Sequence, residues 1–281
     1  MPSSPISNTP ANLPTSTPPD LLERAAPWSR GEWWARGVAT LVFAAAAVVT
    51  LQGVRSMSGG MRMPGGWTMS MMWMVMPGGT AWSTAAMFLL MWQAMMIAMM
   101  LPSTWPILAL YRRVALFHES PHATLGTTLA GVGYFAVWLA FAAAAFGAGF
   151  GLSNWAMHAA RVSALAPRAA ALALILAGVY QLTPLKQSCL RHCREPLLYL
   201  SHVWKPGLGG ALHLGLHHGW FCASCCWALM LIQMLLGLMN LTAMAAIAAV
   251  IALEKLWKRG PLLSRWVGVA AITAGIWVFF A

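Results

Sequence analysis

Long hydrophobic stretches, separated by short segments rich in Arg, Lys, Gly or Pro, make up most of this chain. Each stretch is close to the roughly 20 residues that a helix needs to cross about 30 Å of hydrocarbon. The pattern predicts seven membrane-spanning helices, or six if the weak last one lies along the surface, over residues 36–54, 80–101, 123–151, 168–185, 219–239, 241–257 and 265–281. The expected fold is an all-α, polytopic transmembrane helical bundle, in which Gly147 and Gly151 favour a close helix contact.

The composition excludes a soluble globule. Hydrophobic residues make up 59% of the 281 residues and charged residues only 8%, too few to cover a soluble surface. The charged residues are 17 basic and 6 acidic, an excess that in a soluble domain would indicate nucleic-acid binding. In a membrane protein the same excess indicates basic loops beside anionic lipid. We therefore expect the lipid bilayer as a partner, and no nucleic acid.

Basic residues also predict the orientation. Residues 1–27 are rich in Ser, Thr and Pro and lack a signal peptide, which is typical of a disordered tail. With this tail in the cytoplasm, 13 Lys and Arg residues lie on the inner side and 4 on the outer side. The positive-inside rule therefore favours a cytoplasmic amino terminus, with residues 28–281 as a single membrane-embedded domain, for instance in a bacterial inner membrane.

All five cysteines lie in one region, residues 186–226, which the topology places on the cytoplasmic side. The segment PLKQSCLRHCREP puts Cys189 and Cys193 four residues apart, on one helix face, and Cys222 and Cys226 repeat that spacing in GLHHGWFCASCCWALM. Two such pairs at one membrane depth predict a four-sulfur tetrahedral site of the kind that zinc or Cu(I) accepts. Cys225 is either a further ligand or a packed thiol.

Histidines accompany these cysteines. His192 lies beside Cys193, while His218 lies one turn before Cys222 and directly after His217. A lone cysteine in a helix is usually a small buried hydrophobe, and this interpretation stays open for each of the five. Their confinement to two neighbouring segments with five of the eight histidines nearby favours a metal site instead.

Methionines form a second group of soft ligands. Four of them lie near the cytoplasmic end of the span 80–101, just before two prolines, namely Met95, Met96, Met99 and Met100. Thioether sulfur favours Cu(I) over zinc, so Met99 or Met100 could complete a copper site. Core packing explains the same spacing equally well, since methionine fills apolar cores.

The outer loop, residues 55–79, is also rich in methionine, including Met69, Met71 and Met72. Among Gly and Pro, these side chains predict an exposed, flexible loop that collects copper. An interfacial segment anchored by tryptophan explains the loop equally well.

Glu254 lies beside Lys255 near the cytoplasmic end of the sixth predicted span. A carboxylate at that depth needs a partner. One interpretation is an ion pair with Lys255 at the headgroups. The other is a hydrogen bond that orients a ligand histidine, which would make Glu254 part of the metal site.

These segments, together with residues 92–106 (WQAMMIAMMLPSTWP) and 237–255 (GLMNLTAMAAIAAVIALEK), resemble the predicted metal-binding integral membrane proteins of unknown function. The resemblance covers most of the chain from about residue 57 onward. It implies a polytopic helical fold and a metal site at the paired cysteines. The choice of copper rests on ligand softness.

Three functions follow from these residues. Copper handling, by Cu(I) binding, transfer or transport with a periplasmic or membrane partner protein, uses both cysteine and methionine. A zinc-stapled membrane subunit uses cysteine alone, and a thiol or metal redox enzyme would use the C-x-x-C of Cys222 and Cys225. Haem is not expected, because all eight histidines lie at span ends or in loops. We expect copper handling rather than catalysis.

Overall fold

A computed structural model describes residues 30–56, 59–75 and 78–280, and most of these residues are helical. The chain divides into two compact units, residues 1–38 and 39–281. The described part of the first unit is the start of α2 (Arg30–Ser56). The predicted tail, residues 1–27, lies outside the described residues.

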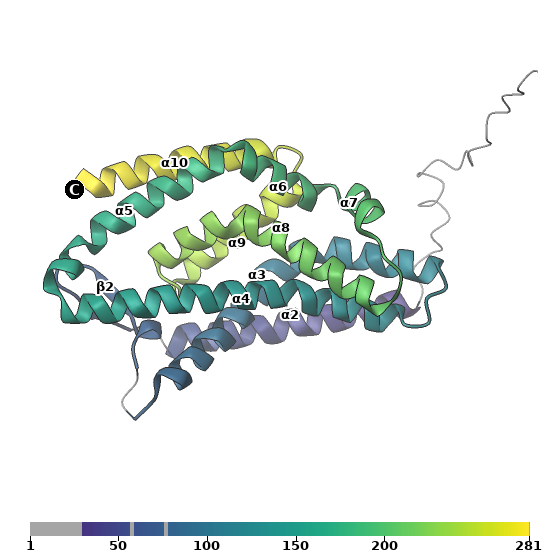
Figure 1. Cartoon of the computed structure of the whole chain (residues 1–281), viewed down its shortest axis with the longest axis horizontal. Coiled ribbons are helices and arrows are strands. Elements are labelled where there is room, and N and C mark those ends of the chain that lie inside the picture. The colour runs from purple at the N-terminus through teal and green to yellow at the C-terminus, as the bar shows by residue number, and fades with distance from the viewer. Residues whose placement is uncertain (1–29, 57–58, 76–77, 281) are drawn as a thin grey trace, which may run out of the picture. The chain divides into compact units, whose positions relative to one another are not determined.

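The second unit is built from the remainder of α2 and eight further helices (Figure 1). They are α3 (Ala81–Phe117), α4 (Ala123–His158), α5 (Ala160–Leu182), α6 (Pro184–Arg194), α7 (Pro196–Val203), α8 (Gly207–Leu236), α9 (Leu241–Leu256) and α10 (Gly260–Phe280). Six helices are long and apolar enough to cross a membrane, namely α2, α3, α4, α5, α8 and α10. The prediction of an all-α polytopic bundle is confirmed.

The helix that falls short of a full span is α9. Its 16 residues extend about 24 Å, which is less than the roughly 30 Å of hydrocarbon. The final helix α10, expected to be the weak one, has 21 residues and is long enough. Of the seven predicted spans, six are therefore long enough to cross a membrane. The one that is too short is the sixth predicted span, α9, rather than the seventh.

Two helices run well past their predicted limits. The helix α3 continues through Pro102 and Pro106 to Phe117, although we expected it to end near residue 101. Helix α8 begins at Gly207 rather than near residue 219. A proline removes one backbone donor without ending a helix that its neighbours enclose, and α3 is packed against α4 and α9. The cysteines of α8 therefore lie near the middle of a helix, not at its start.

Glycines set the closest helix contacts. On α8, a side chain at Gly215 would meet the backbone of Ala130 at 2.0 Å, and one at Gly219 would meet that of Tyr134 at 2.9 Å. These contacts hold α8 beside α4, as Figure 1 shows. The predicted contact through Gly147 and Gly151 is absent, since no described atom lies within 4 Å of an added Cβ at either position.

The described part of the loop between α2 and α3, residues 59–75, folds into a hairpin and buries some of its methionines. The strands β1 (Gly60–Arg62) and β2 (Thr68–Ser70) pair antiparallel, with Met61 opposite Met69, and lead into the 3₁₀ turn η1 (Met71–Trp73). The Trp67 indole donates a hydrogen bond to the Ser163 carbonyl at 3.0 Å. Met69 and Met72 are buried and Met71 is half-buried, whereas Met61 is exposed, so the expectation of exposed thioethers is wrong for Met69 and Met72. Two of its methionines, Met57 and Met76, lie outside the described residues.

The second unit has two ends that matter for the site. The hairpin end comprises residues 59–75 and the α8–α9 turn, residues 237–240, because both contribute to one cavity. At the opposite end of α9, the Arg194 guanidinium of α6 donates hydrogen bonds to the carbonyls of Glu254 and Trp257, each at 2.6 Å. We call this the α6 end, residues 183–194 and 254–260.

Candidate metal centre

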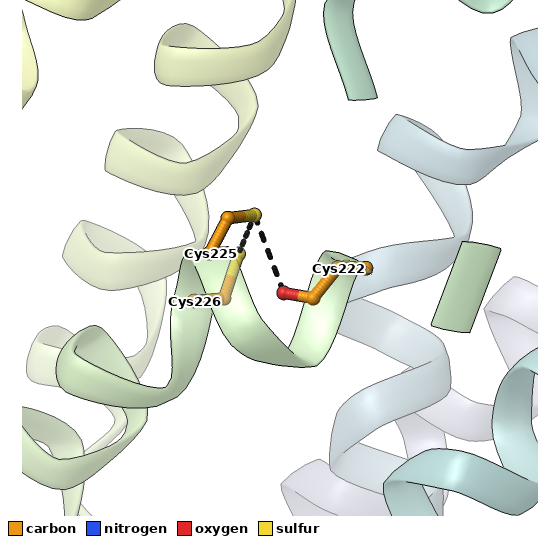
Figure 2. A group of neighbouring side chains, drawn as sticks. All are labelled: Cys222, Cys225 and Cys226. Carbon is orange, nitrogen blue, oxygen red and sulfur yellow. Dashed lines mark hydrogen bonds between the residues drawn. The ribbon is translucent and has the colours of Figure 1, made fainter. Parts of the chain in front are cut away.

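One turn of α8 carries three buried thiols. The Sγ atoms of Cys222, Cys225 and Cys226 all lie within 4.8 Å of one another (Figure 2). Each residue is at most 1% exposed. The spacing i, i+3, i+4 brings these positions to one side of the helix. The Cys225 thiol donates to the Cys222 carbonyl at 3.2 Å, and the Cys225 and Cys226 sulfurs are 3.3 Å apart.

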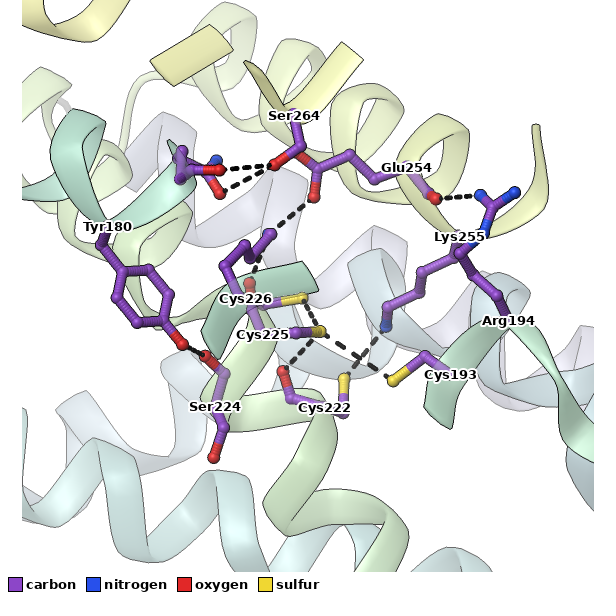
Figure 3. Close-up of polar contacts among 12 residues, drawn as sticks. Tyr180, Cys193, Arg194, Cys222, Ser224, Cys225, Cys226, Glu254, Lys255 and Ser264 are labelled. Carbon is purple, nitrogen blue, oxygen red and sulfur yellow. Dashed lines mark hydrogen bonds and ion pairs between the residues drawn. The ribbon is translucent and has the colours of Figure 1, made fainter. Parts of the chain in front are cut away.

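A fourth sulfur comes from α6. The Sγ of Cys193 lies 3.9 Å from that of Cys225, and Cys193 keeps partial exposure (Figure 3). Its short helix is placed by Pro184 at the first position and by the Thr183 hydroxyl, which accepts from the Lys186 amide. A hydrogen bond with Cys222 raises the pKa of the Cys193 thiol, so a metal that binds there displaces a proton. We call Cys193, Cys222, Cys225 and Cys226 the thiol cluster.

The other α6 cysteine, Cys189, was also a predicted ligand. It is buried, and burial raises the pKa of its thiol. The sulfur contact that the structure describes between α6 and α8 is made by Cys193. Cys225, whose role the sequence left open, takes a central place instead. Cys189 and Cys193 occupy successive turns of a short helix, and Cys193 on the later turn brings its sulfur to 3.9 Å from that of Cys225.

Two buried lysines adjoin the thiols. The Lys255 ammonium lies 3.0 Å from the Cys222 sulfur and 3.4 Å from the Ser103 hydroxyl. Lys186 donates to the Cys225 carbonyl and forms an ion pair with Glu254 at 2.8 Å. Burial disfavours the charge on Lys186, but the neighbouring Cys225 and Glu254 outweigh it and raise its pKa.

Glu254 therefore serves neither of its predicted partners. Its carboxylate pairs with Lys186 of α6 instead of Lys255 or a histidine. This pairing frees Lys255 to face Cys222. A cation at that distance stabilises a thiolate, which is the form that binds metal.

The histidines surround the thiol cluster without joining it. His218 is 5% exposed, its ring stacks on Tyr134, and its Nδ1 has no partner among the described atoms. The His217 Nδ1 lies 2.7 Å from the Tyr199 hydroxyl. The His192 ring stacks on Phe221, and its Nδ1 is hydrogen-bonded to the Ser188 carbonyl.

Tyr134 is a neighbour that the sequence did not indicate. Its hydroxyl lies 2.9 Å from the Cys222 sulfur, where a phenol can donate to a thiolate. It belongs to α4, which carries no other residue of the expected site. Its contact depends on the Gly219 packing described above, which sequence periodicity does not reveal.

The four α3 methionines that the sequence suggested as ligands are all at most 5% exposed, namely Met95, Met96, Met99 and Met100. Met100 approaches the thiol cluster most directly, with its sulfur 4.0 Å from the Lys255 ammonium. The loop methionines Met69 and Met72 lie at the hairpin end, away from the cysteines in sequence and in fold.

The cluster suits a soft monovalent ion. Thiolate and thioether sulfur select Cu(I) among common ions, and zinc is the main competitor for thiolates. Two thiolates carry two negative charges, and one monovalent cation together with the Lys255 ammonium would balance them. This neutrality matters because uncompensated charge is costly in a buried site.

The comparisons agree with this chemistry. A family model described as "PpoB2: Copper chaperone" matches residues 89–278, which is well over half of the chain and includes the whole thiol cluster. No curated protein and no solved structure matches the chain.

Proposed function

We propose that this chain, which belongs to the copper chaperone family, binds Cu(I) in its thiol cluster and transfers it from within the membrane to a partner protein. The observation that carries the proposal is the convergence of three α8 thiols within 4.8 Å, next to Cys193 and the Lys255 ammonium. Such a cluster offers Cu(I) its preferred ligands and one compensating charge.

Transfer requires a ligand that can exchange. Cys222, Cys225 and Cys226 are enclosed by helices, whereas Cys193 keeps partial exposure on α6. A thiol of a partner protein can therefore approach Cu(I) from the Cys193 side while the α8 thiols still hold it. In the orientation that the basic residues favour, this exit faces the cytoplasm of a bacterium.

The test is a Cu(I) titration of the full chain in detergent, under anaerobic reducing conditions, against a chromophoric chelator. We expect tight binding of Cu(I) that persists in the presence of zinc and is lost in the Cys222→Ser/Cys225→Ser double variant. Preferential zinc retention would instead identify a structural zinc staple. Weak binding of both ions by a folded chain would refute the proposal.

Transfer is tested separately by mixing the copper-loaded chain with a soluble dithiol peptide. Cys193→Ser should slow transfer more than it weakens binding, since Cys193 is the accessible ligand. Equal effects on both would place the exit elsewhere.

A further inference from the structure

A small cavity lies at the hairpin end of the same core. It has a volume of about 10 Å³, and five of its eight lining residues are methionines, namely Met72, Met91, Met95, Met239 and Met244. They come from η1, α3, the α8–α9 turn and α9. The lining includes no charged side chain, and the hydroxyl of its one threonine, Thr50, donates to the Ala46 carbonyl. The buried indole N–H of Trp92 is the one lining donor without a partner among the described residues, and it can supply a single hydrogen bond.

The cavity suits a soft ion better than a water molecule. Its volume is about that of a single water-sized sphere, and a buried water needs two to four polar partners. Thioethers are poor hydrogen-bond acceptors but good ligands for Cu(I). The methionine side chain is unbranched and has three rotatable bonds, so its sulfur can turn inward around an ion.

A row of buried methionines joins this cavity to the thiol cluster. Met91, Met95 and Met99 follow one another at four-residue steps on α3, which separates them by about 6 Å along the helix. They belong to the same continuous core as Met100 and the α8 cysteines. Met100 then reaches the Lys255 ammonium at 4.0 Å, and that ammonium lies 3.0 Å from the Cys222 sulfur.

From this arrangement we infer a second Cu(I) site in the cavity, formed by thioethers alone, from which the α3 methionines pass the ion to the thiol cluster. The inference rests on the proposed copper function and adds an entry site and a direction of movement. Copper remains Cu(I) throughout, because each step exchanges one sulfur ligand for another. The only proton released leaves a cysteine thiol when that thiol binds the ion.

The experiment uses the full chain with all five cysteines changed to serine, and Ag(I) as a redox-stable soft monovalent probe. We expect one Ag(I) per chain to remain after dialysis against a weak thioether competitor. Adding Met91→Leu and Met244→Leu keeps the apolar volume but removes two sulfurs, so this Ag(I) should be lost.

Two single variants of the cysteine-free chain provide matched controls. Met87→Leu changes an α3 methionine that is 51% exposed, and Met230→Leu changes a fully buried α8 methionine outside the cavity lining. Both should keep the Ag(I). Retention after Met91→Leu/Met244→Leu, or no Ag(I) in a cysteine-free chain with unchanged helical circular dichroism, would overturn the cavity site.

The native-cysteine background gives an independent measurement if the cysteine-free chain does not fold. There, Met91→Leu/Met244→Leu should bind one Ag(I) fewer than the unaltered chain. An equal stoichiometry would refute the cavity site but leave the thiol cluster intact. Failure of the proposed function looks different, since the unaltered chain would then show no tight Cu(I) binding in the chelator titration.

Discussion

The thiol cluster and the methionine cavity are both soft and buried, yet they differ in charge. The thiol cluster has ionisable sulfurs, the Lys255 ammonium against Cys222 and a second lysine on the Cys225 carbonyl. The cavity is lined mainly by neutral thioethers and has no charged lining residue. Cu(I) in the cavity thus leaves a net positive charge in an apolar place, whereas in the thiol cluster the charges cancel.

This difference gives the two sites opposite uses. A neutral thioether site holds a cation weakly and releases it readily, which suits an entry point. A charge-balanced thiolate site holds it tightly, which suits a carrier that must not lose its copper to solvent. On the proposed function, the ion would therefore move downhill in free energy from the hairpin end to the thiol cluster.

The largest expected effect separates two cysteines of the same chain. Cys222→Ser should weaken Cu(I) binding by about 100-fold, because thiolate sites hold zinc with about 10–16 kcal/mol shared among four ligands. Cys189→Ser, also a buried cysteine, should leave affinity nearly unchanged. Chelator competition measures both, and equal losses would restore the tetrahedral site that the sequence predicts.

The sequence predicted the bundle well because membrane helices are set by local hydrophobicity. The sequence placed the end of α3 too early, since Pro102 and Pro106 signal a helix end only where the neighbouring helices do not support the backbone. It also placed the start of α8 too late. It also misjudged the loop, because pairing of Met61 with Met69 depends on a hairpin register that short strands hardly reveal.

The site was predictable in its ligand type but not in its membership. Paired spacing favoured Cys189 and left the role of Cys225 open, because the contact of Cys225 with Cys193 depends on how α6 meets α8. Tyr134 and Lys186 reach the cysteines across helix interfaces. Cross-helix geometry of this kind is not encoded in the periodicity of a single segment.

The next effect tests the charge difference itself. Lys255→Met removes the cation that faces Cys222, so Cu(I) affinity of the thiol cluster should fall by about 10- to 100-fold, the usual cost of losing a group that supports a metal ligand. Ag(I) retention in the methionine cavity should not change. Lys255→Arg, which keeps the charge, should recover part of the affinity. If Lys255→Met leaves chelator competition unaltered, charge balance does not distinguish the two sites.

A smaller effect concerns the row of methionines between the sites. Met95→Leu/Met99→Leu should slow delivery of Cu(I) from the hairpin end to the thiol cluster by about tenfold, equivalent to about 1.4 kcal/mol in the barrier. Equilibrium affinity of the thiol cluster should stay the same. Stopped-flow measurement in proteoliposomes follows this rate, with Met87→Leu as the control at an exposed α3 methionine. An unchanged rate would mean that copper reaches the cysteines without the α3 thioethers.

The smallest effect concerns the wall of the cavity. Trp67→Phe removes the hydrogen bond from the indole to the Ser163 carbonyl, which fixes the hairpin against the start of α5. We expect a loss of about 1 kcal/mol in stability, the usual contribution of one such bond. Because Met72 follows this hairpin into the cavity, Ag(I) retention by the cysteine-free chain should weaken slightly.

Cu(I) binding by the thiol cluster should not change, since the cluster lies at the middle of α8 and touches no part of the hairpin that the structure describes. Thermal unfolding and the two binding assays measure these three quantities side by side. Equal weakening of both sites would show that the hairpin supports the whole bundle rather than the methionine cavity.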